Sequence, residues 1–139
     1  MPNQVFMIHA RFDDDQRSQL LDAFPPLFHN IYCRQLVWAY RIPDDSVWPQ
    51  DPLVITVTGH HVGDGHQALV CSVELPEETA TMQALGNKRL HITISTADRV
   101  PPASGGDIEL DKVQPVEPLS LTIRLSRGHA MRLAAERRA

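Results

Sequence analysis

Short runs in which apolar and polar residues alternate recur along the whole chain. Alternation with a period of two is typical of a β-strand that buries one face, and it is strict in Leu119–Leu125 (LSLTIRL) and clear in Arg89–Thr96 (RLHITIST). The turn residues at 63–65 (Gly-Asp-Gly) predict a β-hairpin between two apolar runs. Four further segments have the length and the β-branched or aromatic content of strands: Val5–Phe12, Ile31–Tyr40, Leu53–Thr58 and Gln67–Glu74.

Helical spacing occurs in fewer places. The acidic run Asp13–Asp15 offers N-cap candidates, and Pro25-Pro26 ends the helix that follows. A second short helix begins at Pro76, and the basic tail Arg127–Ala139 is helix-prone. Loops are expected at 100–106 and, as a flexible approach to the last strand, at Pro115–Pro118. The first helix has apolar residues at helical intervals, namely Leu20, Leu21, Phe24 and Leu27. Strands outnumber helices, which predicts an α+β domain with a largely antiparallel sheet.

Length and composition fit one globular domain over residues 1–139. The chain has 42% hydrophobic and 22% charged residues, near the averages for folded proteins. Its formal charge of −4 argues against binding nucleic acid by bulk charge but leaves room for a local basic pocket. The N-terminus lacks a secretory pattern, and no apolar run is long enough to cross a bilayer. We therefore expect a cytoplasmic protein without a membrane partner, in which Cys33 and Cys71 are buried free thiols.

The segment His91–Ser95 (HITIS) carries the strongest chemical signal. In a regular strand His91, Thr93 and Ser95 share one face, and the two isoleucines between them share the other. The isoleucines would pack on the core. The polar residues would line a groove with an imidazole for proton transfer and hydroxyls for phosphate oxygens. Taken alone, the pattern favours the polar outer face of an amphipathic strand over a site.

The surroundings of this strand resemble the 2H phosphoesterase superfamily, most closely its RNA-repair branch of tRNA-ligase phosphodiesterase domains and Swiss Army Knife RNA-repair-like proteins. There the second motif typically reads PHITLS before a loop with one or two prolines, and here HITIS precedes Val100-Pro101-Pro102-Ala103. The hairpin before it commonly reads V-x-G-x-x-x-D-x-x-x-Q-A-L-V-V. This chain matches that pattern in order at Val57, Gly59, Asp64, Gln67, Ala68, Leu69 and Val70.

The resemblance implies a compact fold of two small antiparallel β lobes around a central cleft with flanking helices. Each lobe would present one His-x-Thr/Ser motif, one His acting as base and the other as acid on a 2′,3′-cyclic phosphate, without a metal or other cofactor. It implies catalytic roles for His91 and Thr93. It implies substrate binding by Ser95, Gln35 and Arg34, with an RNA 3′ end or a cyclic nucleotide as the partner.

The first motif departs from the family's pattern. Asn30–Tyr40 (NIYCRQLVWAY) aligns with N-x-Y-x-H-H-V-T-L-A-Y, so Gln35 stands where the catalytic His belongs and Val37 where the hydroxyl residue belongs. Gln transfers no proton near neutral pH, and Val has no donor. We therefore expect a degenerate member that binds its nucleotide with slow turnover at best. Two alternatives stay open: an active cyclic phosphodiesterase in which His9 or His29 substitutes, and a non-catalytic protein-interaction module.

Other chemically suggestive residues have plainer explanations. His60, His61 and His66 lie around the hairpin turn without a Cys or carboxylate at a familiar ligand spacing, so we expect solvated imidazoles rather than a metal site.

The aromatic residues and the basic tail likewise allow either a structural or a binding role. Trp38 and Tyr40 are expected in the core, whereas Trp48, in a Pro-flanked loop, is the better candidate for stacking on a base. The tail is expected to be a solvated helix, although its arginines could contact an RNA backbone. These are Arg124, Arg127, Arg132, Arg137 and Arg138.

Overall fold

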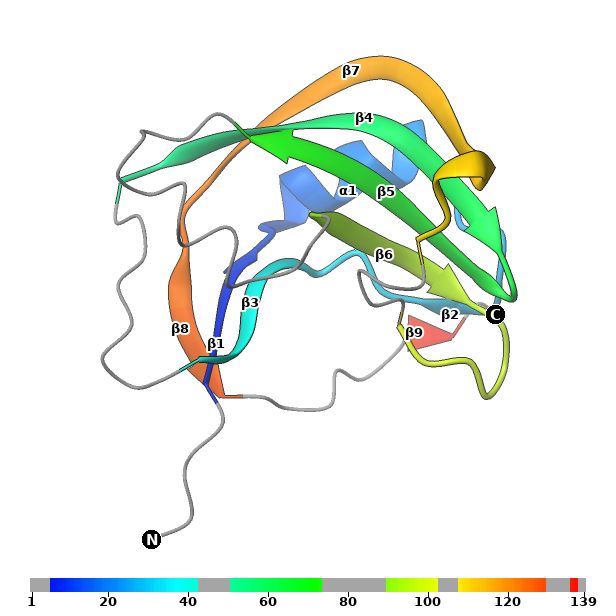
Figure 1. Cartoon of the computed structure of the whole chain (residues 1–139), viewed down its shortest axis with the longest axis horizontal. Coiled ribbons are helices and arrows are strands. Elements are labelled where there is room, and N and C mark those ends of the chain that lie inside the picture. Colours follow the sequence, from blue (N-terminus) through cyan, green and yellow to red (C-terminus); the bar gives the residue numbers. More distant parts are fainter. Residues whose placement is uncertain (1–5, 43–50, 74–89, 103–107, 130–135, 138–139) are drawn as a thin grey trace, which may run out of the picture.

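The computed structural model describes residues 6–42, 51–73, 90–102, 108–129 and 136–137. These residues form mostly antiparallel strands in two sheets, with one α-helix (Figure 1). The predicted α+β class is therefore confirmed. In chain order the elements are β1 (Phe6–Arg11), α1 (Asp14–Ala23), β2 (Asn30–Ile31), β3 (Gln35–Ile42), β4 (Leu53–Gly63), β5 (His66–Val73), β6 (His91–Thr96), the 3-10 helix η2 (Leu110–Lys112), β7 (Val113–Ile123), β8 (Ser126–His129) and β9 (Glu136–Arg137).

The stretch of chain that forms β7 and β8 contributes to both sheets. The smaller sheet has the order β3-β1-β8, and the larger has the order β7-β4-β5-β6-β2-β9. Neighbouring strands pair antiparallel throughout. β7 is an edge of the larger sheet, and after Arg124 and Leu125 the chain continues as β8 at an edge of the smaller one. This stretch follows the outer rim of the molecule in Figure 1.

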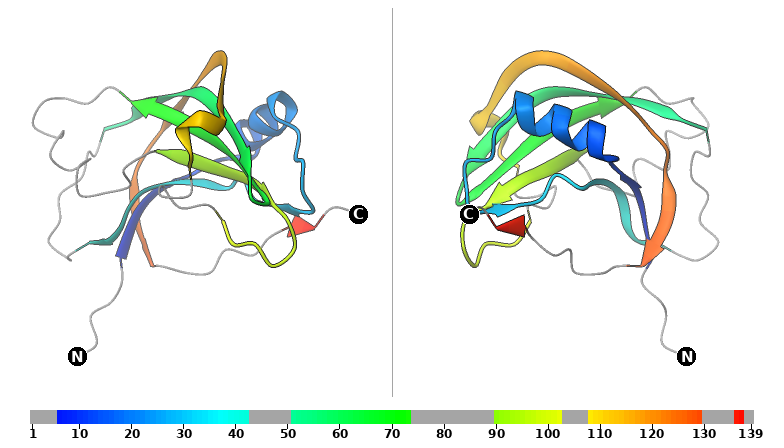
Figure 2. Two further views of the ribbon diagram at one scale, coloured as in Figure 1. Left: turned by 45° about the vertical axis from the view of Figure 1, so that its right-hand side comes forward. Right: turned by 180° about the vertical axis from the view of Figure 1, so that it is seen from behind.

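Helix α1 lies against the back of the six-stranded sheet (Figure 2, right). Its start is fixed by a capping box: Asp13 accepts a hydrogen bond from Gln16 N–H at 2.7 Å, and the Gln16 side chain accepts one from Asp13 N–H at 3.1 Å. The Gln16 amide also donates to the Thr122 carbonyl at 2.7 Å, which ties the helix to β7. The predicted Asp-capped helix is confirmed, but it ends at Ala23. Leu27 therefore lies beyond it, with 54% of its surface exposed.

The main core involves α1 and both sheets. Its burial removes a large apolar area from water, at roughly 25 cal/mol per Å². A small second cluster forms where Ile108 packs on Ala68, together with Val70 and Val113. Trp38 is 1% exposed, as expected for a core residue. The largest fully buried apolar side chains of the main core are Trp38, Ile8, Leu20, Leu36, Ile55, Leu69, Ile92 and Ile94.

Strand β4 changes its buried side at a β-bulge. Thr58 is an extra residue relative to β5, and such a residue shifts the alternation of side chains by one. Before the bulge, residues 53, 55 and 57 pack in the main core. After it, His60 is on the core side, with its ring 5.5 Å from that of Phe24 at the end of α1. His61 reaches the opposite side, where Glu109 N–H donates to its Nε2 at 3.2 Å. We call these two sides of the six-stranded sheet the α1 face and the η2 face.

The segment that resembles the first motif is broken into two strands. Cys33 has a φ of 60°, which interrupts an extended backbone. The residues before it form β2 in the larger sheet, and those after it form β3 in the smaller sheet. The prediction of one strand over Ile31–Tyr40 is therefore wrong, because the two halves pair with different sheets and the apolar pattern does not reveal that change of partner.

Two predictions for the C-terminal quarter are also wrong. Pro115–Pro118 belongs to β7 and is not a flexible approach to it. Proline is tolerated there because β7 is an edge strand. The helix expected over 127–139 is absent from the described part of that tail, where β8 pairs with β1 and β9 with β2. Strand pairing outweighs a helix preference worth only tenths of a kcal/mol per residue.

The predicted hairpin is confirmed and is longer than expected. β4 and β5 meet at Asp64 and Gly65, whose φ angles of 50° and 83° are both positive, as in the tight turns that suit twisted strands. The second helix, expected from Pro76, and the stacking candidate Trp48 lie outside the described residues.

Candidate functional site

Strand β6 places His91 and Thr93 together on the η2 face. His91 lies opposite Val70, and Thr93 lies opposite Ala68, which packs on Ile108. Paired residues of antiparallel strands share a face, so His91 and Thr93 lie on one side of the sheet, as expected. His91 is 8% exposed and Thr93 is partly exposed. The imidazole is therefore shielded from bulk water.

Ser95 lies on the other face of the sheet. Ile94 is an extra residue relative to β5, between the Thr93–Ala68 and Ser95–Gln67 pairs. This bulge shifts the alternation, so Ser95 turns to the α1 face and Thr96 takes its place on the η2 face. The expectation that His91, Thr93 and Ser95 share one face is thus wrong for Ser95.

The Ser95 hydroxyl is committed to protein partners. The residue is fully buried, and its Oγ donates to Gln67 Oε1 at 2.6 Å. It also accepts hydrogen bonds from the N–H groups of Leu27 and Phe28, at 3.3 and 3.2 Å. The Ser95 hydroxyl is therefore already engaged in three hydrogen bonds within the protein, and not with a ligand.

Gln67 is the centre of this buried network. Its Oε1 accepts a second hydrogen bond from Leu27 N–H at 2.9 Å, and its Nε2 donates to the Pro25 carbonyl and to His60 Nε2, each at 3.1 Å. The network fixes the 25–28 loop on the sheet. Because His60 Nε2 accepts a hydrogen bond from the Gln67 amide, His60 is neutral, and burial correspondingly lowers its pKa below the usual 6.5.

The segment with the degenerate first motif runs alongside β6. Beyond β2, the N–H groups of Tyr32 and Cys33 donate to the carbonyls of Ile94 and Thr93, at 2.7 and 2.8 Å. Arg34 and Gln35 follow at once, both partly exposed, and β3 and β6 come into contact there. The two segments that the sequence singled out are therefore neighbours in space.

His9 contacts Gln35 directly. His9 Nδ1 donates to Gln35 Oε1 at 2.8 Å, and His9 is 8% exposed. The ring fits because residue 128 is glycine: a Cβ there would lie 2.6 Å from His9 Nε2. His29, the other substitute named above, is exposed and directly precedes β2. Of the two candidates, His9 is the one in contact with the first-motif position.

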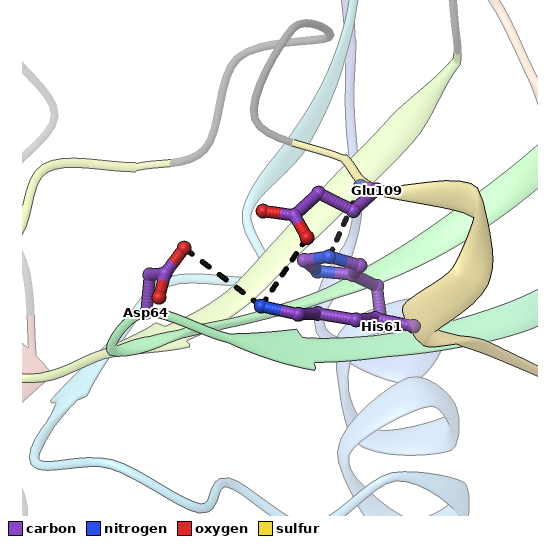
Figure 3. Close-up of polar contacts among 4 residues, drawn as sticks. His61, Asp64 and Glu109 are labelled. Carbon is purple, nitrogen blue, oxygen red and sulfur yellow. Dashed lines mark hydrogen bonds and ion pairs between the residues drawn. The ribbon is translucent and has the colours of Figure 1, made fainter.

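The histidines near the hairpin turn are not solvated as expected. His61 and His66 are 1% and 7% exposed, and their rings stack at 5.5 Å between centroids. Lys112 Nζ forms ion pairs near His61, 3.3 Å from Glu109 Oε2 and 3.9 Å from Asp64 Oδ2 (Figure 3). Burial, together with the nearby His66 and Lys112, lowers the pKa of His61, and the two carboxylates oppose this only partly. Among the described residues, no group of three or more His, Cys, Asp or Glu side chains is placed to hold a metal ion.

The two cysteines take no part in this chemistry. Cys33 and Cys71 are buried and free, as expected. Burial raises the pKa of each thiol to about 12, so neither is a thiolate near neutral pH.

Gln67 and Thr96 were missed as polar residues of interest. The hairpin pattern of the resemblance includes Gln67 but gives it no role. Its signal was a large amide in an otherwise apolar strand, where burial requires hydrogen-bond partners. Thr96 could not be assigned because its face depends on the bulge at Ile94.

Comparisons with known proteins returned no match among protein families, curated proteins or solved structures. None of the helices in the described part of the chain is long and apolar enough to cross a membrane. A function therefore has to be inferred from the side chains of two neighbouring segments, namely His91 and Thr93 of β6 and Arg34 and Gln35 after β2, with His9 in contact with Gln35.

Proposed function

We propose that the chain is a 2H phosphoesterase-like protein that binds 2′,3′-cyclic phosphate nucleotides or RNA 3′ ends, with slow turnover at best. The alignment of the first-motif segment with β6 supports this most. Cys33 N–H donates to the Thr93 carbonyl at 2.8 Å. Arg34 and Gln35 follow Cys33 directly, and β3, which begins at Gln35, contacts β6. The two motif segments would therefore lie close enough to contact one ligand.

The residues offer the donors that a phosphate needs. A phosphate diester presents only acceptors, which favours charge-assisted hydrogen bonds from Arg34 and hydroxyl donation from Thr93. Gln35 Oε1 is occupied by His9, which leaves the Gln35 amide N–H groups as donors toward the ligand. His91 would supply the one imidazole of the second motif.

Turnover would be limited by the missing first histidine. Each general acid or base contributes roughly 10²–10⁴-fold to a rate, so the loss of one predicts slow hydrolysis or none. A working phosphodiesterase that uses His9 is the second candidate, favoured by the 2.8 Å contact between His9 and Gln35. In that case the contact with Gln35 would hold the His9 proton on Nδ1 and leave Nε2 as the nitrogen that acts as base.

Binding and turnover can be separated in one set of titrations. Calorimetry with 2′,3′-cyclic AMP and with a short RNA ending in a cyclic phosphate should give binding that weakens at least tenfold in His91→Ala and weakens with salt. Gln114→Ala, an exposed substitution on the edge strand β7, serves as the control and should bind like the wild type. Absence of binding to both ligands would refute the proposal and favour a protein-interaction module.

Phosphate products, followed by chromatography, test the catalytic candidate. Residual hydrolysis that disappears in His9→Asn but persists in His29→Ala would assign His9, and the reverse would assign His29. The double substitution Gln35→His and Val37→Thr should raise turnover from an inert parent if the scaffold is a lapsed enzyme.

A further inference from the structure

The η2 face carries a row of buried polar atoms beyond His91 and Thr93. In the described part of the chain, four buried side-chain polar atoms have no hydrogen-bond partner. Three of them are Thr96 Oγ1, His66 Nδ1 and His61 Nδ1. They are contiguous, because Thr96 lies opposite His66 and the His66 ring stacks on His61. The fourth, Trp38 Nε1, belongs to a residue of the main core.

Such a concentration of unpartnered atoms points to a ligand. Leaving a buried donor or acceptor unpaired is costly, and folded proteins contain few such groups. All three residues are more than nine-tenths buried, and they come from three adjacent strands, β4, β5 and β6. They therefore form one site and not three unrelated packing defects.

The tautomer of His61 decides which kind of ligand fits. Its Nε2 accepts the Glu109 N–H at 3.2 Å, so in the neutral ring the proton is on Nδ1. A protonated nitrogen donates a hydrogen bond and cannot ligate a metal. The Thr96 hydroxyl is likewise available as a donor. The site therefore suits a ligand with hydrogen-bond acceptors, of which phosphate oxygens are the strongest.

We propose that Thr96, His66 and His61 form a second oxyanion subsite, which binds the phosphate next to the cyclic one. The preferred ligand is then the end of an oligonucleotide and not a mononucleotide. This inference rests on the function proposed for His91 and Thr93. Thr93 lies opposite Ala68 and Thr96 opposite His66. Two positions along an extended strand correspond to about 6.7 Å, so the two threonines are about that far apart along the sheet. That separation suits two successive phosphates of one nucleotide chain.

The Lys112 ammonium group lies near His61, at one end of this row of residues. Lys112 forms ion pairs with Glu109, which precedes η2, and with Asp64, in the hairpin turn; both pairs lie next to His61 (Figure 3). Residues 108–112 cover this end, with Ile108 packed on Ala68 and Glu109 bonded to His61. A phosphate entering the subsite would replace the Glu109 carboxylate as the partner of Lys112. Glu109→Gln should therefore tighten binding of the longer ligand.

Two ligands and two matched variants test the subsite. The ligands are 2′,3′-cyclic AMP and the dinucleotide ApA ending in a 2′,3′-cyclic phosphate, titrated by calorimetry. The wild type should bind the dinucleotide at least tenfold more tightly. Thr96→Val should reduce the dinucleotide affinity to that of the mononucleotide, leave mononucleotide binding unchanged and raise Tm, because it removes an unpartnered hydroxyl at constant volume. Thr122→Val, an exposed threonine on β7, should change neither affinity.

The possible failures are distinguishable. Equal affinity of the wild type for the two ligands, or equal weakening of both by Thr96→Val, overturns the subsite and leaves the proposed function standing. Absence of binding to either ligand overturns both. A rise in Tm with Zn²⁺ alone that is lost in His66→Gln would identify a metal site and overturn the oxyanion assignment.

Discussion

Replacing Gln67 by alanine should destabilise the fold more than any exposed substitution on the same sheet. Gln67 is fully buried and makes four hydrogen bonds through one amide group. They connect β5 to β6, to His60 on β4 and to the loop after α1. Gln67→Ala removes all four at once and leaves a cavity where the four side-chain heavy atoms beyond Cβ were.

The magnitude follows from what the partners lose. Leu27 N–H keeps Ser95 Oγ as a partner at 3.3 Å, and the exposed Pro25 can turn its carbonyl to water. The Ser95 hydroxyl and His60 Nε2 lose their Gln67 partner, at a cost of about 1–3 kcal/mol for each buried group. With the cavity, we expect a loss of roughly 3–5 kcal/mol, against a total stability of about 5–15 kcal/mol for a domain of this kind.

Urea unfolding followed by circular dichroism measures this loss. Gln114→Ala, on the exposed side of β7, is the control and should stay within about 0.5 kcal/mol of the wild type. Ser95→Ala combined with Gln67→Ala should be non-additive by about 0.5–3 kcal/mol, because the two side chains share one hydrogen bond of 2.6 Å. A Gln67→Ala loss below about 1 kcal/mol, or strict additivity, would refute the idea that the network holds the loop on the sheet.

Two further predictions concern titration. Burial lowers the folded-state pKa of His60 and His61 below 6.5, so at mildly acidic pH the unfolded chain binds more protons, and the free energy of unfolding should fall as pH drops through 6.5. At pH 5.5 the loss in free energy of unfolding is at most about 1.4 kcal/mol per histidine. Urea unfolding at pH 5.5 and 7.5 measures this loss, and His61→Gln should reduce it. Greater stability at pH 5.5 than at pH 7.5 would contradict the prediction. Because the pKa of Cys33 and Cys71 is about 12, a thiol reagent at pH 8 should label neither cysteine in the native protein and both in urea; rapid native labelling would contradict their burial.

Local sequence rules were sufficient where the determining interactions are local. The capped start of α1 is set by Asp13 and Gln16, three residues apart, and the hairpin turn by Asp64 and Gly65, where both φ angles are positive. Alternation located β6 and the second half of β7, and β-branched or aromatic content located β1, β4, β5 and most of β3. These features depend on neighbours within one turn of helix or one hairpin, so a single sequence contains them.

Features set by distant partners could not be predicted. The chain leaves one sheet for the other at Cys33 because Tyr32 and Cys33 pair with β6 whereas the following residues pair with β1. β8 forms because it pairs with β1, in a tail for which the sequence predicted a helix. In both cases the partner lies far away in sequence, and the local pattern carries no trace of it.

The candidate site depends on this distant information most strongly. Simple alternation groups His91 and Thr93 with Ser95 and leaves the face of His61 undefined. The bulge at Ile94 turns Ser95 to the α1 face and Thr96 to the η2 face, and the bulge at Thr58 turns His61 to the η2 face as well. Two single-residue insertions in neighbouring strand pairs thus gather polar residues from β4, β5 and β6 on one surface. An uninterrupted alternation would have divided them between two surfaces, and so the case for an extended ligand rests on the bulges more than on the motif.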